Sequence, residues 1–212
     1  MARIRKSSMR EQCYMVLKEK ILKQEYDLGD DINIVAFSND YSVSNTPIRE
    51  ALALLQADGI VTSSLNSKVR VITFDENSFH EMTQTISILL TGAYLQCVKE
   101  KKSKLLIQLM EQSLKKQRTR LSEKDYYNFI HEAINFDKCI LDALGNTRLL
   151  DVFASISNIL FLMTRTDHQK NEHQREINIQ EHTQILEALK NNNNDEFLKL
   201  LEHHYDKSLG LP

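Results

Sequence analysis

The sequence predicts a mainly α-helical protein in two parts: an N-terminal winged helix-turn-helix with three helices and a β-hairpin, then an all-α bundle of about six helices. Three observations lead to this prediction. The 212 residues include only 5 Gly and 2 Pro, which suits long helices better than a turn-rich β fold. Apolar residues recur at helical spacing along most of the chain. One short stretch, 60–72, instead has two apolar runs around a polar turn.

Composition and cysteine usage narrow the class of protein. The chain is 42% hydrophobic and 26% charged with a formal net charge of -2, so no bulk positive charge indicates nucleic acid. The N-terminus continues into EQCYMVLKEKILK rather than an apolar run, and we expect no signal peptide. No stretch of about 20 uncharged apolar residues occurs, so we expect no membrane partner. The 3 scattered Cys indicate reduced thiols in a cytoplasmic protein, not a disulfide framework or zinc motif.

The first 74 residues have the order expected of a winged helix-turn-helix. A first helix, with apolar residues at helical spacing, is predicted to end before Gly29, and a short helix is predicted over 34–40. A third helix starts near Thr46 or Pro47 and ends before Gly59. Two apolar runs then flank the turn SSLNSK, in which Asn66 can take a left-handed conformation. We therefore expect a DNA-binding domain over 1–74.

The rest of the chain keeps helical periodicity and forms the second predicted domain, 75–212. Six amphipathic segments are separated by turn signals, among them Gly145-Asn146 and the Asn run 191–194. The segments begin near Ser78, Ser103, Lys124, Thr147, Arg175 and Asp195. The pattern therefore indicates an all-helical bundle over this range.

The start of the third helix is a candidate DNA-reading end. Pro47 is favoured at the first helical position, where its missing N–H costs nothing, and Thr46 before it can act as N-cap. Ile48 and the apolar residues that follow at helical spacing form a buried stripe. The polar residues left on the outward end are Ser44, Asn45, Thr46 and Arg49. A recognition helix uses this end in the major groove, although solvated cap residues on any small helical domain would give the same pattern.

Basic residues elsewhere in the first domain are further candidates for DNA contact. Arg49 suits a bidentate contact with a guanine edge or a phosphate. Arg10 closes the basic segment MARIRKSSMR, which could lie on phosphates, although short basic N-termini are common. Lys68 ends the predicted turn of the hairpin and Arg70 follows it, and both can reach the DNA backbone or the minor groove.

Three polar residues in the second domain stand where the helical pattern requires apolar ones. Asp137 interrupts the apolar stripe of its helix, and His182 and His204 each share a face with Leu and other apolar residues. His182 lies 11 residues before Asn193 and His204 lies 11 after it, so an antiparallel helix hairpin would place both imidazoles at one level. Two His and one carboxylate facing a common interior suit a divalent metal with open positions. The alternative is separate structural histidines and an Asp that bonds locally.

The segment GDDINIVAFSNDYSVSNTPIREALALLQADGIV resembles the GntR family of bacterial transcription regulators. The resemblance covers about residues 10–74 and includes the family pattern Val-Ser-x-Thr-Pro-x-Arg-Glu-Ala-Leu. It implies dimeric operator binding by Ser44, Thr46, Arg49 and the wing. The family usually has Arg at the position of Asn45 and Gly at that of Lys68, so the operator read cannot be carried over.

The segments FDKCILDALGN and EHTQILEAL, together with His204, resemble the ligand-binding FCD domain of the FadR subfamily. That resemblance implies an all-helical bundle that often carries a metal held by one Asp and three His. His182 and His204 fall on two of the His positions, Asp137 occupies the third, and Ala133 replaces the family Asp. A zinc, nickel or manganese ion would therefore be held by Asp137, His182 and His204.

The predicted function is a transcription regulator, in the commoner case a repressor, whose homodimer binds double-stranded operator DNA under control of a small-molecule or metal ligand. The family often places an Arg near an acidic effector, and none occurs between Arg70 and Arg118, which weakens the case for a carboxylate effector. A metal-dependent enzyme is an alternative, although no His-Glu-x-x-His motif is present. An interaction module that keeps the helix-turn-helix only as a scaffold is another. His168 and His173 are expected to be solvated.

Overall fold

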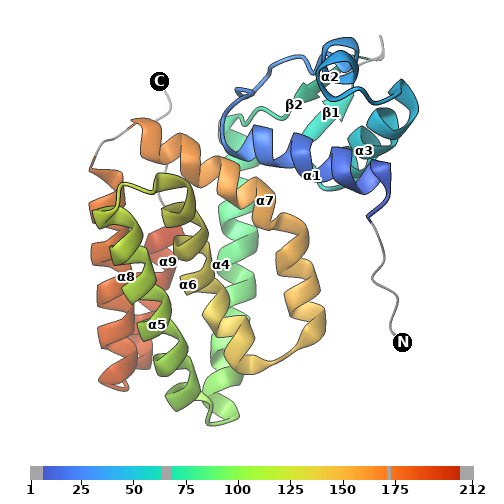
Figure 1. Ribbon diagram of the computed structural model, residues 1–212. Coiled ribbons are helices and arrows are strands. Elements are labelled where there is room, and N and C mark those ends of the chain that lie inside the picture. The colour runs from blue at the N-terminus through green and yellow to red at the C-terminus, as the bar shows by residue number, and fades with distance from the viewer. Residues whose placement is uncertain (1–6, 64–67, 171–172, 206–212) are drawn as a thin grey trace, which may run out of the picture. The chain divides into compact units, whose positions relative to one another are not determined.

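The computed structural model describes residues 7–63, 68–170 and 173–205, with the backbone alone at Lys170. The chain divides into two compact units, Met1–Thr73 and Phe74–Pro212 (Figure 1). Within the described residues, the first unit holds three helices and a two-stranded antiparallel sheet, and the second holds helices alone. The winged helix-turn-helix and the helical bundle predicted from the sequence are therefore confirmed.

The first unit is built around its third helix. In chain order its elements are α1 (Met9–Leu22), α2 (Ile34–Tyr41), α3 (Asn45–Ala57), β1 (Val61–Ser63) and β2 (Val69–Val71). Helix α1 begins at a capping box in which the Ser8 and Glu11 side chains each accept a backbone N–H of the other residue. Helix α3 packs against α1, α2 and β1 because its stripe from Ile48 to Leu55 is buried.

Helix α3 starts at Asn45, one to two residues before the predicted start near Thr46 or Pro47, and the prediction of Thr46 as N-cap is wrong. The N-cap is Ser44, whose extended backbone (φ -65°, ψ 159°) leads directly into Asn45. Pro47 is then the third helical residue. It is tolerated there because the first four N–H groups of a helix have no intrahelical partner.

The wing consists of strands β1 and β2 and of a third extended segment, around Asp31, that forms a single bridge with β2. Strand β1 pairs with β2 with Thr62 opposite Arg70. The segment before α2 pairs with the other edge of β2: the Gly29 N–H donates to the Val71 carbonyl at 3.1 Å, and the Ile32 N–H donates to the Val69 carbonyl at 2.8 Å. Gly29 has φ +87°, and a Cβ there would lie 3.3 Å from Thr73 Cγ2. The predicted role of Asn66 lies outside the described residues.

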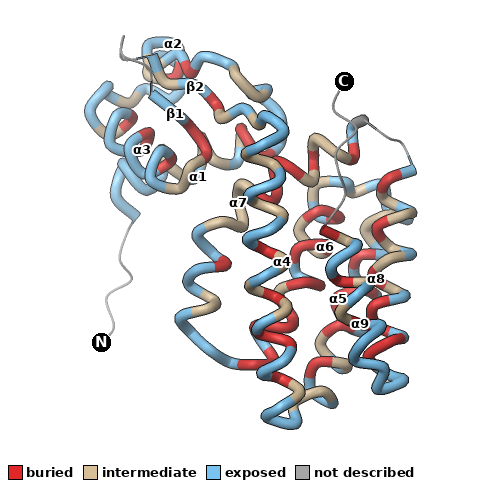
Figure 2. Tube along the Cα trace, turned by 180° about the vertical axis from the view of Figure 1, so that it is seen from behind, coloured by how far each residue is buried: buried red, intermediate tan, exposed pale blue. Residues whose placement is uncertain are grey.

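The second unit is a bundle centred on α6. In chain order its helices are α4 (Glu76–Lys99), α5 (Ser103–Ser122), α6 (Tyr126–Leu144), α7 (Thr147–Lys170), α8 (Gln174–Lys190) and α9 (Asn194–Tyr205). Helix α6 packs against α4, α5 and α7, while α8 packs against α5 and α9. Buried residues gather on the sides of these helices that face one another (Figure 2). The bundle thus turns residues of α5, α6, α8 and α9 toward one interior.

Two local features close the bundle. Gly145 ends α6 in the left-handed conformation, φ +73°, with its N–H bonded to the Leu141 carbonyl. Asn191 to Asn193 form the turn between α8 and α9, which makes the predicted helix hairpin. Tyr94 of α4 stacks on Phe197 of α9, and its hydroxyl donates to Asn194 Oδ1 at 2.7 Å. These contacts hold α9 against the body of the bundle.

Candidate nucleic-acid interface and metal centre

The outward end of α3 presents polar side chains to solvent. Ser44, Asn45, Thr46 and Arg49 are all exposed, whereas Ile48 between them is completely buried. The Ser44 side chain makes no capping bond to the helix, so its hydroxyl is not consumed by the backbone of α3. Burial of one apolar residue per turn therefore determines which neighbours face outward.

Arg49 is exposed and, among the described residues, forms no hydrogen bond or ion pair. Its guanidinium keeps five N–H donors in a planar fork that suits guanine edges and phosphates. Arg10 is also exposed, in the first turn of α1. Both side chains are accessible to a ligand.

Unlike Arg49, the two wing cations Lys68 and Arg70 both contact an acidic side chain, that of Asp31. Arg70 Nε lies 2.5 Å from Asp31 Oδ1, and Lys68 Nζ lies 3.3 Å from Asp31 Oδ2. The hydrogen bond from Arg70, supported by Lys68, lowers the pKa of Asp31. Sequence reasoning missed Asp31 because it is 37 and 39 residues away from these cations. The pairing arises when the segment before α2 joins the edge of β2.

Asp137 of α6, His182 of α8 and His204 of α9 lie together inside the second unit. Ligand atoms of the three side chains are within 4.8 Å of one another, and His182 Nε2 is 3.9 Å from Asp137 Oδ1. The antiparallel pairing of α8 and α9 brings the two histidines to one level, with ring centroids 4.9 Å apart. Ligand atoms around a tetrahedral zinc ion lie roughly 3.3 Å apart, so shifts of about 1 Å or less would bring these three onto one ion.

His182 is oriented by a buried chain of amides. Its Nδ1 lies 2.9 Å from Gln117 Oε1, and the Gln117 amide nitrogen donates to Asn178 Oδ1. Because the bond to Asn178 identifies the Gln117 amide nitrogen, its oxygen must accept from a protonated Nδ1 of His182. Nε2 of His182 then carries the lone pair that faces Asp137. Metal-bound histidines show this outer hydrogen bond almost always.

The Nδ1 atom of His204 also has a hydrogen-bond partner, but this partner is an acidic residue rather than an amide. Its Nδ1 lies 2.8 Å from Glu181 Oε2, which leaves Nε2 for a ligand. The outer partners Gln117, Asn178 and Glu181 were missed by sequence reasoning. Asn178 stands four residues before His182, on the same helical face, which is a usable signal. No pattern in the sequence indicates Gln117, because it belongs to another helix.

Asp137 is the least satisfied member of the site. Among the described residues, its Oδ1 has no hydrogen-bond partner. Burial raises the pKa of its carboxyl, and the nearby His204 and the Tyr205 hydroxyl only partly oppose this. Buried Ala133, one turn earlier on α6, offers no ligand atom. Two imidazoles and one carboxylate therefore fit a divalent cation whose remaining positions are open.

The expectation that His168 is solvated is wrong. His168 is 3% exposed and lies 5.6 Å, ring to ring, from Phe129, whereas His173 is exposed as expected. Spacing between the two histidines could not show which face the end of α7 presents to the bundle. His168 lines a cavity of about 70 Å³ together with His204 and Tyr205. This cavity, beside the metal-site residues, has room for roughly two water molecules.

Known proteins resemble both units. Residues 9–71 match the family of bacterial regulatory proteins named gntR, and residues 86–207 match the FCD domain. The chain belongs to the GntR family. It is a transcription regulator with a DNA-binding helix-turn-helix domain and a ligand-binding FCD domain, in keeping with the FadR subfamily.

Several known proteins are similar to this chain in sequence or in fold. The uncharacterized HTH-type transcriptional regulator YdhC of Bacillus subtilis (strain 168) is 23% identical over 190 residues, 87% of this chain and 82% of YdhC. A putative GntR regulator from Rhodococcus sp. RHA1 has the same fold, with a TM-score of 0.80 at 16% identity over 97% of this chain and 100% of that one. E. coli McbR/YncC gives 0.69 at 16% identity over 94% of each chain. GntR regulators are not enzymes, so the enzyme alternative is not retained.

In the metal-free GntR protein, we expect Asp137→Asn to raise stability at pH 7.5 by roughly 1–3 kcal/mol, because it removes a buried carboxylate with an unsatisfied oxygen. The folded pKa of Asp137 lies above its ordinary value of 3.8, so the unfolded chain ionises first and stability falls as pH rises above that value. The gain should therefore shrink as pH falls toward 4. Thermal unfolding in chelator at several pH values measures it.

The matched control is Asp142→Asn, which alters an exposed carboxylate paired with Lys138 on the same helix. It should change stability by less than about 0.5 kcal/mol. A destabilised Asp137→Asn protein at pH 7.5 would contradict the unsatisfied state of this carboxyl.

Proposed function

We propose that this regulator reads its operator with the outward end of α3. The observation that carries the proposal is the exposed Arg49 guanidinium, which has no partner among the described residues and follows a fully buried Ile48. The hydroxyls of Ser44 and Thr46 and the amide of Asn45 surround the start of the helix and suit phosphates or base edges. Arg49 is assigned the contact with a guanine edge in the major groove.

The backbone contacts in this proposal come from Arg10 and from the wing residues Lys68 and Arg70. Arg10 is free to lie on a phosphate, whereas Lys68 and Arg70 must share their charge with Asp31. The wing therefore presents about one net positive charge instead of two. This lowers the expected salt dependence of operator binding, which grows with each phosphate neutralised.

We expect Arg49→Ala to weaken operator binding by about 1–3 kcal/mol, roughly 5- to 150-fold, through loss of a bidentate base contact. Thermal stability should stay within about 0.5 kcal/mol, because the side chain is exposed. Operator fragments selected from a random pool, followed by a gel-shift titration at fixed salt, measure the change.

Lys23→Ala is the control, since Lys23 is an exposed cation at the end of α1 held by Glu19. It should leave specific affinity nearly unchanged. If Arg49→Ala binds the selected operator as tightly as the parent, α3 does not read DNA through this residue.

The second part of the proposal is a metal-dependent effector site in the FCD domain. Asp137, His182 and His204 would hold zinc, nickel or manganese, with Gln117 and Glu181 orienting the two imidazoles. A bound ion would supply positive charge and open positions for donor atoms of a small-molecule effector. The adjacent 70 Å³ cavity is where such donor atoms would enter. Effector binding would relieve repression if it favours a dimer arrangement that cannot hold the operator.

We expect His182→Ala to remove metal binding, because two donors alone do not hold zinc tightly. Gln117→Leu should weaken zinc affinity by about 10- to 100-fold, since the imidazole loses the hydrogen bond that sets its tautomer. Metal-stripped protein equilibrated with zinc, with bound metal quantified after removal of free ion, gives both results.

His203→Ala provides the matched control, because His203 is exposed beside His204 and contributes no atom to the three-residue site. It should bind one zinc per chain like the parent. Equal zinc content in the parent and in His182→Ala would rule out this centre.

Homodimerisation is the third part of the proposal. Helix α4 carries an exposed apolar face formed by Ile88 (68% exposed), Gly92 and Leu95 (52% exposed). Nothing lies within 4 Å of the position a Cβ would take at Gly92, so another helix can approach there. Apolar surface of this extent on a regulator suits a subunit interface. A cytoplasmic location would follow from this function.

Helix α7 also carries exposed apolar residues that we assign to the dimer interface. Its segment Thr147–Gln169 is the stretch, among the described residues, that is long and apolar enough to cross a membrane by length and composition, and 28% of its most apolar 18-residue window is buried. The segment belongs to the FCD domain, and Val152 on it is 47% exposed. We assign its exposed apolar residues to the dimer rather than to a membrane.

We expect Ile88→Glu combined with Leu95→Glu to convert the dimer into a monomer, because two carboxylates would be buried without partners. Sedimentation equilibrium at micromolar concentration distinguishes the two masses. Leu105→Glu, at a 44% exposed position on α5, is the control and should stay dimeric. An unchanged dimer in the double variant would place the interface elsewhere.

A further inference from the structure

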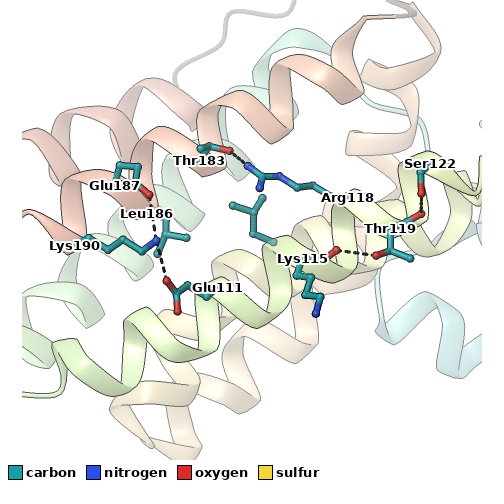
Figure 3. Close-up of a pocket in the computed structure, with 10 residues that line it drawn as sticks. Glu111, Lys115, Arg118, Thr119, Ser122, Thr183, Leu186, Glu187 and Lys190 are labelled. Carbon is teal, nitrogen blue, oxygen red and sulfur yellow. Dashed lines mark hydrogen bonds and ion pairs between the residues drawn. The ribbon is translucent and has the colours of Figure 1, made fainter.

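A surface groove runs between α5 and α8, on the side of these helices that faces away from the metal-site residues. Its volume is about 520 Å³, within the range of roughly 300–1,000 Å³ common for small-molecule sites. Figure 3 shows Glu111, Lys190 and Glu187 at one end of the groove and Arg118 bonded to Thr183 farther along it, toward Ser122. The groove is distinct from the 70 Å³ cavity near His204.

The charges of the groove are unevenly satisfied. Lys190 lies 2.8 Å from Glu111 and 3.2 Å from Glu187, so its ammonium is neutralised within the groove. Arg118 is exposed and donates to the neutral Thr183 hydroxyl at 2.8 Å, but among the described residues it forms no ion pair. Lys115, one turn earlier on α5, likewise has no acidic partner in the described part of the chain.

We propose that this groove binds a small anion, through a carboxylate or phosphate group held by the Arg118 guanidinium. A guanidinium presents paired N–H donors that match two oxygens of such a group, and only some of these donors are used by Thr183. Lys115 also lines the groove and adds a positive charge to it. The Thr183 hydroxyl donates to the Ile179 carbonyl at 2.6 Å, which holds it in place as an acceptor for Arg118.

The groove is linked to the metal centre by two parallel bridges between the same helices. On the inner side, Gln117 of α5 bonds His182 of α8. On the outer side, the next residue of each helix forms the second bridge, from Arg118 to Thr183. An anion bound by the free donors of Arg118 shares the guanidinium with Thr183 and so alters the outer bridge, and the relative position of α5 and α8 changes with it. Anion binding thereby changes the orientation of His182, and the regulatory meaning of this change rests on the proposed metal centre.

The test is a titration of the metal-free, full-length protein, labelled with ¹⁵N, with inorganic phosphate and separately with succinate at constant ionic strength. The measured signals are Arg118 Nε–Hε, the backbone amides of α5 and α8, and the His182 ring nitrogens. We expect saturable shifts at Arg118 with at least one of the two anions, which also distinguishes a phosphate site from a carboxylate site. The His182 signals should shift with the same midpoint.

Arg118→Gln and Arg120→Gln form a matched pair, since both remove one charge from α5. Arg120 is held by Glu123 and Asp125, so its loss should leave anion affinity within about twofold, whereas Arg118→Gln should weaken it by about tenfold or more. Shifts that do not saturate, or an equal loss in both variants, would overturn the anion site.

Saturable groove shifts with His182 unmoved would overturn the coupling and leave the anion site in place. No DNA or metal enters this experiment. Its failure is therefore distinguishable from a failure of operator reading or of zinc binding.

Discussion

The hydrogen bond between Gln117 and His182 is the contact on which the candidate metal site of the FCD domain depends. Both side chains are completely buried, so neither can exchange this bond for one with water. Asn178 completes the chain and leaves Gln117 only one way to face the imidazole. The histidine is thereby held with its Nε2 toward Asp137 before any ligand arrives. Such preorganisation is a general requirement of a precise binding site.

Burying polar side chains in the interior of the bundle costs folding stability. A polar group in a low-dielectric core is tolerated when its hydrogen bonds are complete, and Gln117 and Asn178 satisfy each other. Asp137 is not satisfied in this way, and burial raises the pKa of its carboxyl. Retaining such a residue against its cost in stability is typical of functional sites, where binding energy from a ligand offsets local strain.

The DNA-binding domain is arranged in the opposite way, because the side chains proposed to contact DNA are exposed. Burial of Ile48, Leu52 and Leu55 leaves no choice about the orientation of Arg49. The site on α3 needs no supporting network, since its partner would supply the missing hydrogen bonds. The wing differs, because Asp31 already engages Lys68 and Arg70. The candidate metal site thus depends on buried contacts, and the candidate DNA interface on exposed side chains.

Local periodicity in the sequence determined the order of helices, the hairpin and the two-domain plan, because apolar spacing and turn residues act over a few neighbours. It also singled out Asp137, His182 and His204, since a polar residue in an apolar stripe is visible without coordinates. Only the tertiary structure decided that Gln117 faces His182, that Asp31 pairs with Arg70, and that His168 is buried. These contacts join residues tens of positions apart, and pairing across that distance depends on how helices and strands pack rather than on any local pattern. The start of α3 was misplaced for a smaller reason: Pro is tolerated at several positions of a first helical turn, so it did not identify the N-cap.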